Sequence, residues 1–107
     1  MYAAIYLFRT HPETENEFVK AWEDLTLMIR KYEGSLGSRL HRSEADVREF
    51  FAYALWPDGK TYKEAGNSMP PEVEDIRRRM REACENIETT FTGEVGEDFI
   101  IDQPESL

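Results

Sequence analysis

The sequence has few of the residues that build covalent or metal-based sites. Its 107 residues include one cysteine, Cys84, which excludes a disulfide within the chain. The two histidines, His11 and His41, fall with Cys84 on separate segments at no ligand spacing, so we predict no metal site. A glycine-rich phosphate loop is also missing, because no helical pattern opens after Gly93 and Gly96. We therefore expect no cofactor.

Positive charge and long apolar runs are scarce too. The formal net charge of −9 argues against nucleic acid or an anionic membrane as a partner, since phosphate would be repelled. There is no run of eighteen apolar residues, and the chain starts with a strand pattern rather than a signal peptide. An apolar share of 40% and an aromatic share of 12% indicate a folded chain. We expect a cytoplasmic protein with a single domain over 1–107.

The first half of the chain predicts a strand, a helix and a hairpin. The strand at 2–9 is apolar on both faces, so both should be covered. Thr14 to Glu17 fits a capping box, which predicts a helix running to about Lys31 and ending at Gly34. Its inward stripe contains Phe18, Trp22, Leu25, Ile29 and Tyr32. A weak edge strand at 36–43 and a strand at 50–56 should pair through the polar turn 44–48.

The second half predicts two helices and a closing strand. Asp58 can cap a short helix that ends at Gly66. Pro71 suits the first position of a longer helix over 71–87, and we read Cys84 on its inner face as buried and unreactive. The inward residues should be Val73, Ile76, Met80, Ala83, Cys84 and Ile87. A strand near 88–95 follows, with a short extension over 99–101 and a frayed end.

This order of elements predicts an α+β fold. A β-α-β unit followed by a second one is the ferredoxin-like split arrangement, with a four-stranded antiparallel sheet and helices on one face. The second face of the sheet is also apolar and needs a cover. A second copy is the economical cover, so we predict a homodimer whose sheets pack face to face into a barrel.

The ordered set of segments resembles the antibiotic biosynthesis monooxygenase domain family, of the dimeric α+β barrel group. The resemblance covers roughly residues 2–92. It rests on the opening strand, the turn with a proline, Phe18 and Trp22 on the helix, Gly34 with Leu36, the strands Leu36–Arg42 and Phe50–Trp56, and Gly66-Asn67-Ser68. Beyond Phe91 the sequence departs from the pattern, so 93–107 is interpreted as a divergent C-terminal extension.

The resemblance implies one pocket per subunit between the sheet and the helices. Some members oxidise aromatic polyketides with molecular oxygen and no cofactor, others degrade haem, and many have no known activity. The haem-degrading members use an Asn on the first strand, a Trp at the end of the third and a His on the following helix. Here Trp56 matches that Trp, but the strand at 2–9 has no Asn and the helix at 71–87 has no His. Haem degradation is therefore not predicted.

Three residues are candidates for catalysis. Trp56 offers a flat indole and one N–H donor, Asn67 could hold an enolate oxygen, and His41 or a tyrosine could move a proton. Each has a structural alternative: a core Trp at the end of the barrel, a loop residue before Pro70, and an exposed His beside Arg39.

Substrate contacts are predicted for Trp56, Tyr53, Tyr6 and Arg77. The tyrosines could equally be packing residues, and Arg77 is part of a run of arginines whose carboxylate neighbours suggest a solvated helix face. The leading hypothesis is a homodimeric, cofactor-independent monooxygenase acting on a small planar aromatic molecule. The alternatives are a non-catalytic binding or sensing protein on the same fold, and a structural dimeric accessory domain.

Overall fold

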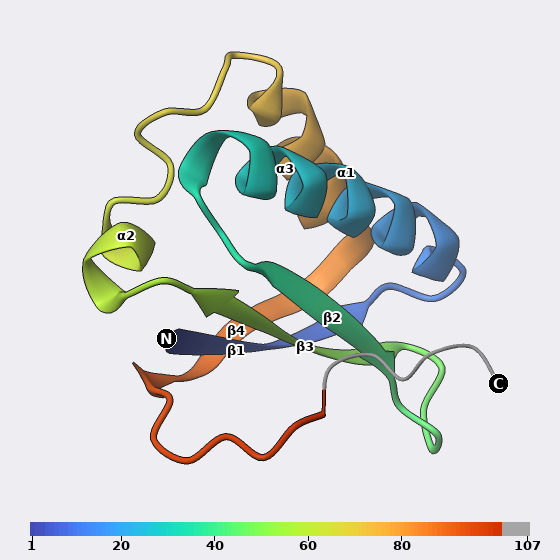
Figure 1. Ribbon diagram of the computed structural model, residues 1–107. Helices are drawn as coiled ribbons and strands as arrows, with labels where there is room; N and C mark the ends of the chain where they lie inside the picture. The colour runs from blue at the N-terminus through green and yellow to red at the C-terminus, as the bar shows by residue number, and fades with distance from the viewer. Residues whose placement is uncertain (102–107) are drawn as a thin grey trace, which may run out of the picture.

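Four strands form one antiparallel sheet in the computed structural model, which describes residues 1–101. The order across the sheet is β2-β3-β1-β4. The strands are β1 (Tyr2–Thr10), β2 (Gly37–Arg42), β3 (Glu49–Trp56) and β4 (Cys84–Glu94). The helices are α1 (Glu15–Glu33), α2 (Gly59–Lys63) and α3 (Val73–Ala83). Figure 1 shows α1 and α3 side by side over one face of the sheet, with α2 beyond the end of β3. The predicted ferredoxin-like α+β fold is confirmed, and so is the position of β2 at an edge, paired with β3.

The core lies between this sheet and the two long helices. Phe18 of α1 is fully buried between Phe8 of β1 and Phe50 of β3, with ring centroids 4.9 and 4.8 Å away. Ala4 and Ala52, which are also fully buried, share this face of the sheet and leave room for the larger rings. Burying each phenylalanine contributes roughly 1.5–3 kcal/mol. Period-two alternation along β1 and β3 therefore selects the residues that meet the helices.

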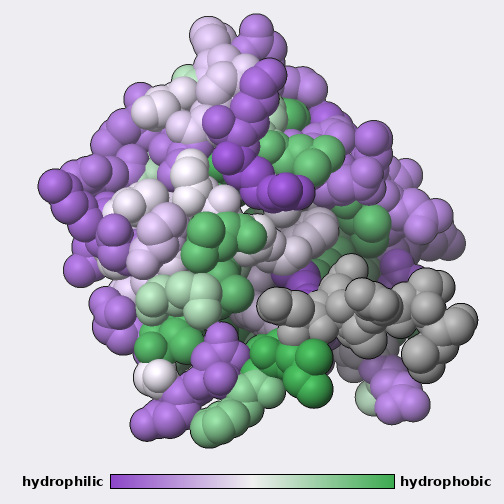
Figure 2. Space-filling model, in the orientation of Figure 1, coloured by the Kyte–Doolittle hydropathy of each residue, from purple (hydrophilic) through white to green (hydrophobic). Residues whose placement is uncertain are grey.

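The opposite face of the sheet carries no helix. Phe51 and Phe91 are 41% and 58% exposed there. Figure 1 shows the segment 95–101 running below this face, where the Val95 N–H donates to the Met1 carbonyl at 2.8 Å. The lower part of the surface in Figure 2 is rich in hydrophobic residues, whereas the helical layer above it is mostly hydrophilic. The face that the sequence marks as apolar is thus only partly covered by its own chain.

The beginning of α1 differs from the prediction. The helix starts at Glu15, but the Thr14 side chain makes no capping hydrogen bond, so the predicted capping box is wrong. Instead, the Thr14 hydroxyl lies 2.9 Å from the His11 carbonyl and 2.8 Å from the Ala83 carbonyl. It thereby satisfies a carbonyl at the end of α3, a partner that local sequence does not reveal. Gly34 ends α1 in the left-handed conformation with φ 76°, as predicted.

The boundary between α3 and β4 is also corrected. The helix was predicted over 71–87, but it ends at Ala83, and Cys84 already pairs with Thr10 of β1. Pro71 lies in the turn before the helix, where its carbonyl accepts a hydrogen bond from Glu74 at 3.1 Å. Pairing with β1 supplies hydrogen bonds to backbone groups that a longer helix would have bonded internally. The predicted strand extension over 99–101 is irregular in the structure.

The short helix α2 follows the prediction more closely. Its N-cap is Asp58, whose carboxylate accepts a hydrogen bond from the Thr61 N–H at 2.7 Å. The helix ends at Lys63, three residues before the predicted end. None of the helices in residues 1–101 is long and apolar enough to cross a bilayer.

Candidate functional site

A cavity of about 250 Å³ lies between the sheet and helix α1. Trp22 and Leu25 of α1 form one wall, and Phe8, Ala54 and Trp56 of the sheet form the other. The remaining lining residues are Tyr6, Thr26, Ile29, Ser35, Ser38, Met80 and Ile87. The cavity is mostly apolar with a few hydroxyl groups, which is the usual make-up of a small-molecule site.

Trp56 closes one end of this cavity. It is the last residue of β3, is 3% exposed, and meets the Tyr62 ring edge-on at 5.6 Å. Among the residues that the structure describes, its indole Nε1 has no hydrogen-bond partner. Leaving a buried donor unpaired costs about 1–3 kcal/mol. A ligand that brings an oxygen acceptor to this wall would recover that free energy.

Tyr6 supplies a second polar group to the cavity. Burial raises the pKa of its phenol above the ordinary value of 10.0, and a hydrogen bond with Tyr62 raises it further. Tyr6 is therefore neutral at physiological pH and suited to donate a hydrogen bond, not to accept a proton as a base. Tyr6 and Trp56 are the two predicted site residues that the structure places together in the cavity.

Tyr53 and His41 lie on the other face of the sheet. Ala54 and Trp56 point toward the helices, so alternation turns Tyr53 the opposite way. There its hydroxyl accepts a hydrogen bond from Arg39 at 2.7 Å, and its ring stacks on His41 with centroids 5.8 Å apart. His41 itself is exposed. Both residues are separated from the cavity by the sheet, so their roles in the site stay predictions.

Asn67 and Arg77 are neighbours outside the cavity. Asn67 is exposed after α2, and the next backbone N–H, that of Ser68, donates to the Glu33 carboxylate at 3.1 Å. The Arg77 guanidinium lies beside Gly66 and donates to Glu74 at 2.9 Å. Neither residue lines the cavity in this structure. The oxyanion contact of Asn67 and the substrate contact of Arg77 therefore remain predictions.

Several residues that line the cavity are not marked as site residues by the sequence pattern. Trp22 was assigned to the core, and Thr26, Ser35 and Ser38 were given no role. Thr26 follows Trp22 by one helical turn, and Ser38 shares a strand face with the apolar Leu40. These spacings could have placed both hydroxyls beside the apolar layer. Whether that layer leaves a cavity depends on side-chain volumes across three elements, which no spacing reports.

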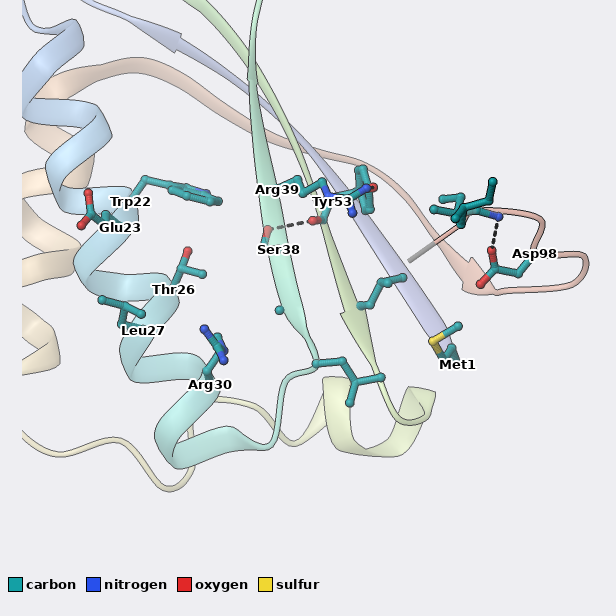
Figure 3. A pocket seen from close by; sticks show the side chains of 15 residues that line it. Met1, Trp22, Glu23, Thr26, Leu27, Arg30, Ser38, Arg39, Tyr53 and Asp98 are labelled. Atoms are coloured by element: carbon teal, nitrogen blue, oxygen red, sulfur yellow. Dashed lines mark hydrogen bonds between the residues drawn. The ribbon is translucent and has the colours of Figure 1, made fainter. Parts of the chain in front are cut away.

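A larger, open groove of about 740 Å³ adjoins the cavity. Figure 3 shows it between α1, the edge strand β2 and the segment that contains Asp98. Trp22, Thr26 and Ser38 line both the groove and the cavity. We place the ligand ring in the smaller cavity, because it is the more enclosed and is lined by Trp56, whose indole N–H is unpartnered.

Cys84 is a free cysteine whose side chain is buried. Burial raises the pKa of the Cys84 thiol from 9.0 to about 11, so it is protonated at neutral pH. Within residues 1–101, no group of three His, Cys, Asp or Glu side chains is arranged to hold a metal ion.

Comparison with known proteins identifies relatives by fold. SnoaB, a cofactor-independent oxygenase from Streptomyces nogalater, superimposes with a TM-score of 0.77 at 14% identity, over 92% of this chain and 95% of SnoaB. Rv0793 from Mycobacterium tuberculosis gives 0.72 at 14% identity, over 92% of this chain and 98% of the other. PA3566 from Pseudomonas aeruginosa gives 0.65 at 17% identity, over 81% and 86%. At these identities the likeness establishes the fold alone.

The family is established by sequence. No curated protein matches the chain. Residues 1–83, however, match the family model described as antibiotic biosynthesis monooxygenase, which leaves all of β4 and the C-terminal segment outside the match. The match contains β1, both walls of the cavity except Ile87, and Trp56. The chain therefore belongs to the antibiotic biosynthesis monooxygenase family.

Proposed function

We propose that this protein is a cofactor-independent monooxygenase that oxidises a small planar aromatic molecule. The observation that carries the proposal is the apolar cavity with an unpartnered indole N–H at its wall. Membership of the monooxygenase family and the likeness to SnoaB support it. A volume of about 250 Å³ lies just below the usual range of roughly 300–1,000 Å³ for ligand pockets, which favours one or two fused rings.

The arrangement suits a substrate that carries a phenolic oxygen. With the ring between Trp22 and Phe8, this oxygen would accept a hydrogen bond from Trp56, and a second one from Tyr6 once that hydroxyl leaves Tyr62. Both donors stabilise the phenolate more than the phenol, because negative charge develops on that oxygen. The phenolate then supplies electrons to O₂. One oxygen atom enters the ring at the para C–H carbon and the other leaves as water, so phenol and O₂ give quinone and water without an external reductant.

The proton acceptor and the second oxyanion donor are assigned to residues outside the cavity wall. We keep His41 or a tyrosine as the acceptor and Asn67 as the donor, but His41 and Asn67 are exposed and would have to move to reach the cavity. Tyr6 is within the cavity but remains protonated. If His41 transfers the proton, His41→Gln should lower kcat and leave ligand affinity unchanged, which a steady-state comparison measures.

A binding or sensing protein is the second candidate. The observation that favours it is the absence of a suitable base: Tyr6 is the only titratable residue among those lining the cavity in residues 1–101, and burial keeps it neutral. Such a site would hold an aromatic ligand through Trp56 without deprotonating it. Catalysis and binding then differ in the consumption of oxygen, not in affinity.

An oxygen electrode combined with tryptophan fluorescence separates the two functions, with 1-naphthol as the probe. A monooxygenase should consume one O₂ for each quinone formed, above the rate without protein. Trp56→Phe, which keeps a ring but removes the N–H, should weaken binding about fivefold to tenfold. Tyr32→Phe, at an exposed position of α1 outside the cavity and the groove, is the control and should change neither quantity. Binding without oxygen uptake supports the sensing function, and no binding of 1-naphthol or larger hydroxyarenes contradicts both.

We also propose that the molecule functions as a homodimer joined through the open sheet face. The support is the apolar character of that face, where Phe51 and Phe91 are exposed beside Ile5 and Leu7 of β1. Exposed apolar patches of this kind mark interaction surfaces. Helices α1 and α3 already cover the other face, so the cavity stays within one subunit.

A further inference from the structure

The mouth of the cavity opens toward the groove beside β2. Trp22, Thr26 and Ser38 line both spaces, so a molecule whose ring fills the cavity can extend into the groove without crossing the main chain. In Figure 3, Trp22, Thr26 and Arg30 project from α1 toward β2, each about one turn from the next. Arg30 therefore lies beyond the mouth, on the same side of the helix as the cavity wall.

Arg30 is a cation without a carboxylate partner in residues 1–101. Arg39, which also lines the groove, is likewise outside any ion pair there and donates to the Tyr53 hydroxyl at 2.7 Å. Arg30 thus presents an unpaired positive charge beside the cavity mouth, in a chain whose net charge is −9.

Two carboxylates line the same groove, and neither neutralises Arg30. Glu23 lies on the side of α1 away from β2 in Figure 3. The Asp98 carboxylate accepts a hydrogen bond from the Ile100 N–H at 3.0 Å, within the segment on the far side of the groove. Arg30 also belongs to the last turn of α1, where a cation favours the helix dipole. The interaction with the helix dipole requires only that Arg30 lies in the last turn of α1. It does not require the Arg30 side chain to point toward the cavity mouth.

We propose that the ligand of this site is an aromatic carboxylate. Its ring occupies the cavity, and its carboxylate is held by Arg30 at the mouth. A guanidinium matches a carboxylate with two parallel N–H donors, which an ammonium or a hydroxyl does not. This inference rests on the cavity of the proposed function but not on its oxidation chemistry.

A matched pair of probes tests the proposal: 2-naphthoate and 2-naphthamide share ring and shape but differ in charge. Isothermal titration at low ionic strength should show naphthoate binding about tenfold more tightly, a preference that falls as salt is added. Arg30→Gln should remove this preference and leave the affinity for naphthamide unchanged. Arg81→Gln, which removes the same charge from an exposed position on α3 outside both spaces, should keep it. Thermal unfolding of each variant verifies that it is folded.

The outcomes separate this inference from the function on which it rests. Equal affinity for the two probes overturns the carboxylate proposal and leaves the aromatic cavity intact. A naphthoate preference that survives Arg30→Gln but disappears in Arg39→Gln overturns the assignment to Arg30. A protein that binds neither probe loses the cavity assignment and the carboxylate proposal together.

Discussion

Phe50 and Phe51 are consecutive, chemically identical residues of β3 with different surroundings. Phe50 is 1% exposed and lies against Phe18 of α1, whereas Phe51 is 41% exposed on the face without helices. The contrast continues along the strand, where Ala52, Ala54 and Trp56 are buried and the residues between them are not. Burial in this chain is decided by which side of the sheet a residue faces, not by its hydrophobicity.

The two faces of the sheet also differ in the kind of surface that they offer to a ligand or a partner. The helix-covered face encloses a cavity sized for a small molecule, with an unpaired N–H donor. The open face presents an apolar surface that the segment 95–101 only partly covers. We interpret the first as a ligand site and the second as a surface for another copy of the chain. A substitution confined to one face of the sheet tests each interpretation separately.

The largest expected effect is on the covered face. Phe50→Ala removes a fully buried ring from between the sheet and Phe18 and should lower the free energy of unfolding by about 3–5 kcal/mol. Urea unfolding monitored by circular dichroism measures this loss. A decrease below about 1 kcal/mol would mean that the core closes around the missing ring, and that the two faces differ less than their exposure suggests.

On the open face, the effect should fall on association. Phe51→Asp places a carboxylate at the centre of the proposed dimer surface and should weaken dimerisation at least about a hundredfold, which corresponds to about 2.7 kcal/mol. Sedimentation equilibrium measures the dissociation constant. Val47→Asp introduces the same charge in the exposed turn between β2 and β3 and should leave association unchanged. A wild-type chain that is monomeric at all concentrations would refute the dimer.

The smallest effect concerns pH and the packing of the two helices. The Arg79 guanidinium of α3 lies 3.0 Å from Asp24 of α1 and, with Lys20, holds the pKa of this carboxyl below its ordinary 3.8. A lowered folded pKa contributes stability that is present above the unfolded value and is lost as pH falls through the folded one. The pair is near the surface, so this contribution should be less than about 1 kcal/mol.

Asp24→Asn should therefore be less stable than the wild type at neutral pH and nearly equal to it once the pH has fallen below the lowered pKa of the folded state, where both side chains are neutral. Urea midpoints measured from neutral to acid pH give the difference. A constant difference across that range would show that the substitution acts through packing and not through the charge of Asp24.

Much of the fold could be predicted from the sequence, because strands and helices produce periodic patterns of apolar residues over short stretches of chain. Alternation in β1 and β3 and the stripe of α1 indicate which residues face the core, and Asp58 and Gly34 mark helix ends. The order of these elements indicates the ferredoxin-like sheet, and the position of Trp56 at the end of a buried strand indicates one end of the site. All of these signals lie within a few residues of the feature that they predict.

The errors occur where a distant segment competes with a local pattern. Residues 84–87 continue the helical spacing of α3, yet they pair with β1, more than seventy residues earlier in the chain. Thr14 fits a capping box but bonds to the Ala83 carbonyl. Tyr53 and Trp56 seemed natural partners for one ligand ring, although their spacing of three places them on opposite faces of a strand.

Residue types and short spacings were enough to identify the family, the order of the elements and the apolar character of both sheet faces. Three features follow from packing in the folded chain: which face the helices cover, where helix gives way to strand at Cys84, and which hydroxyls surround the cavity. The cavity itself, with the unpaired Trp56 N–H, exists because side chains from α1, α3 and the sheet do not fill the space between them. The volume left unfilled depends on how the side chains pack in three dimensions, and no periodic pattern in the sequence reports it.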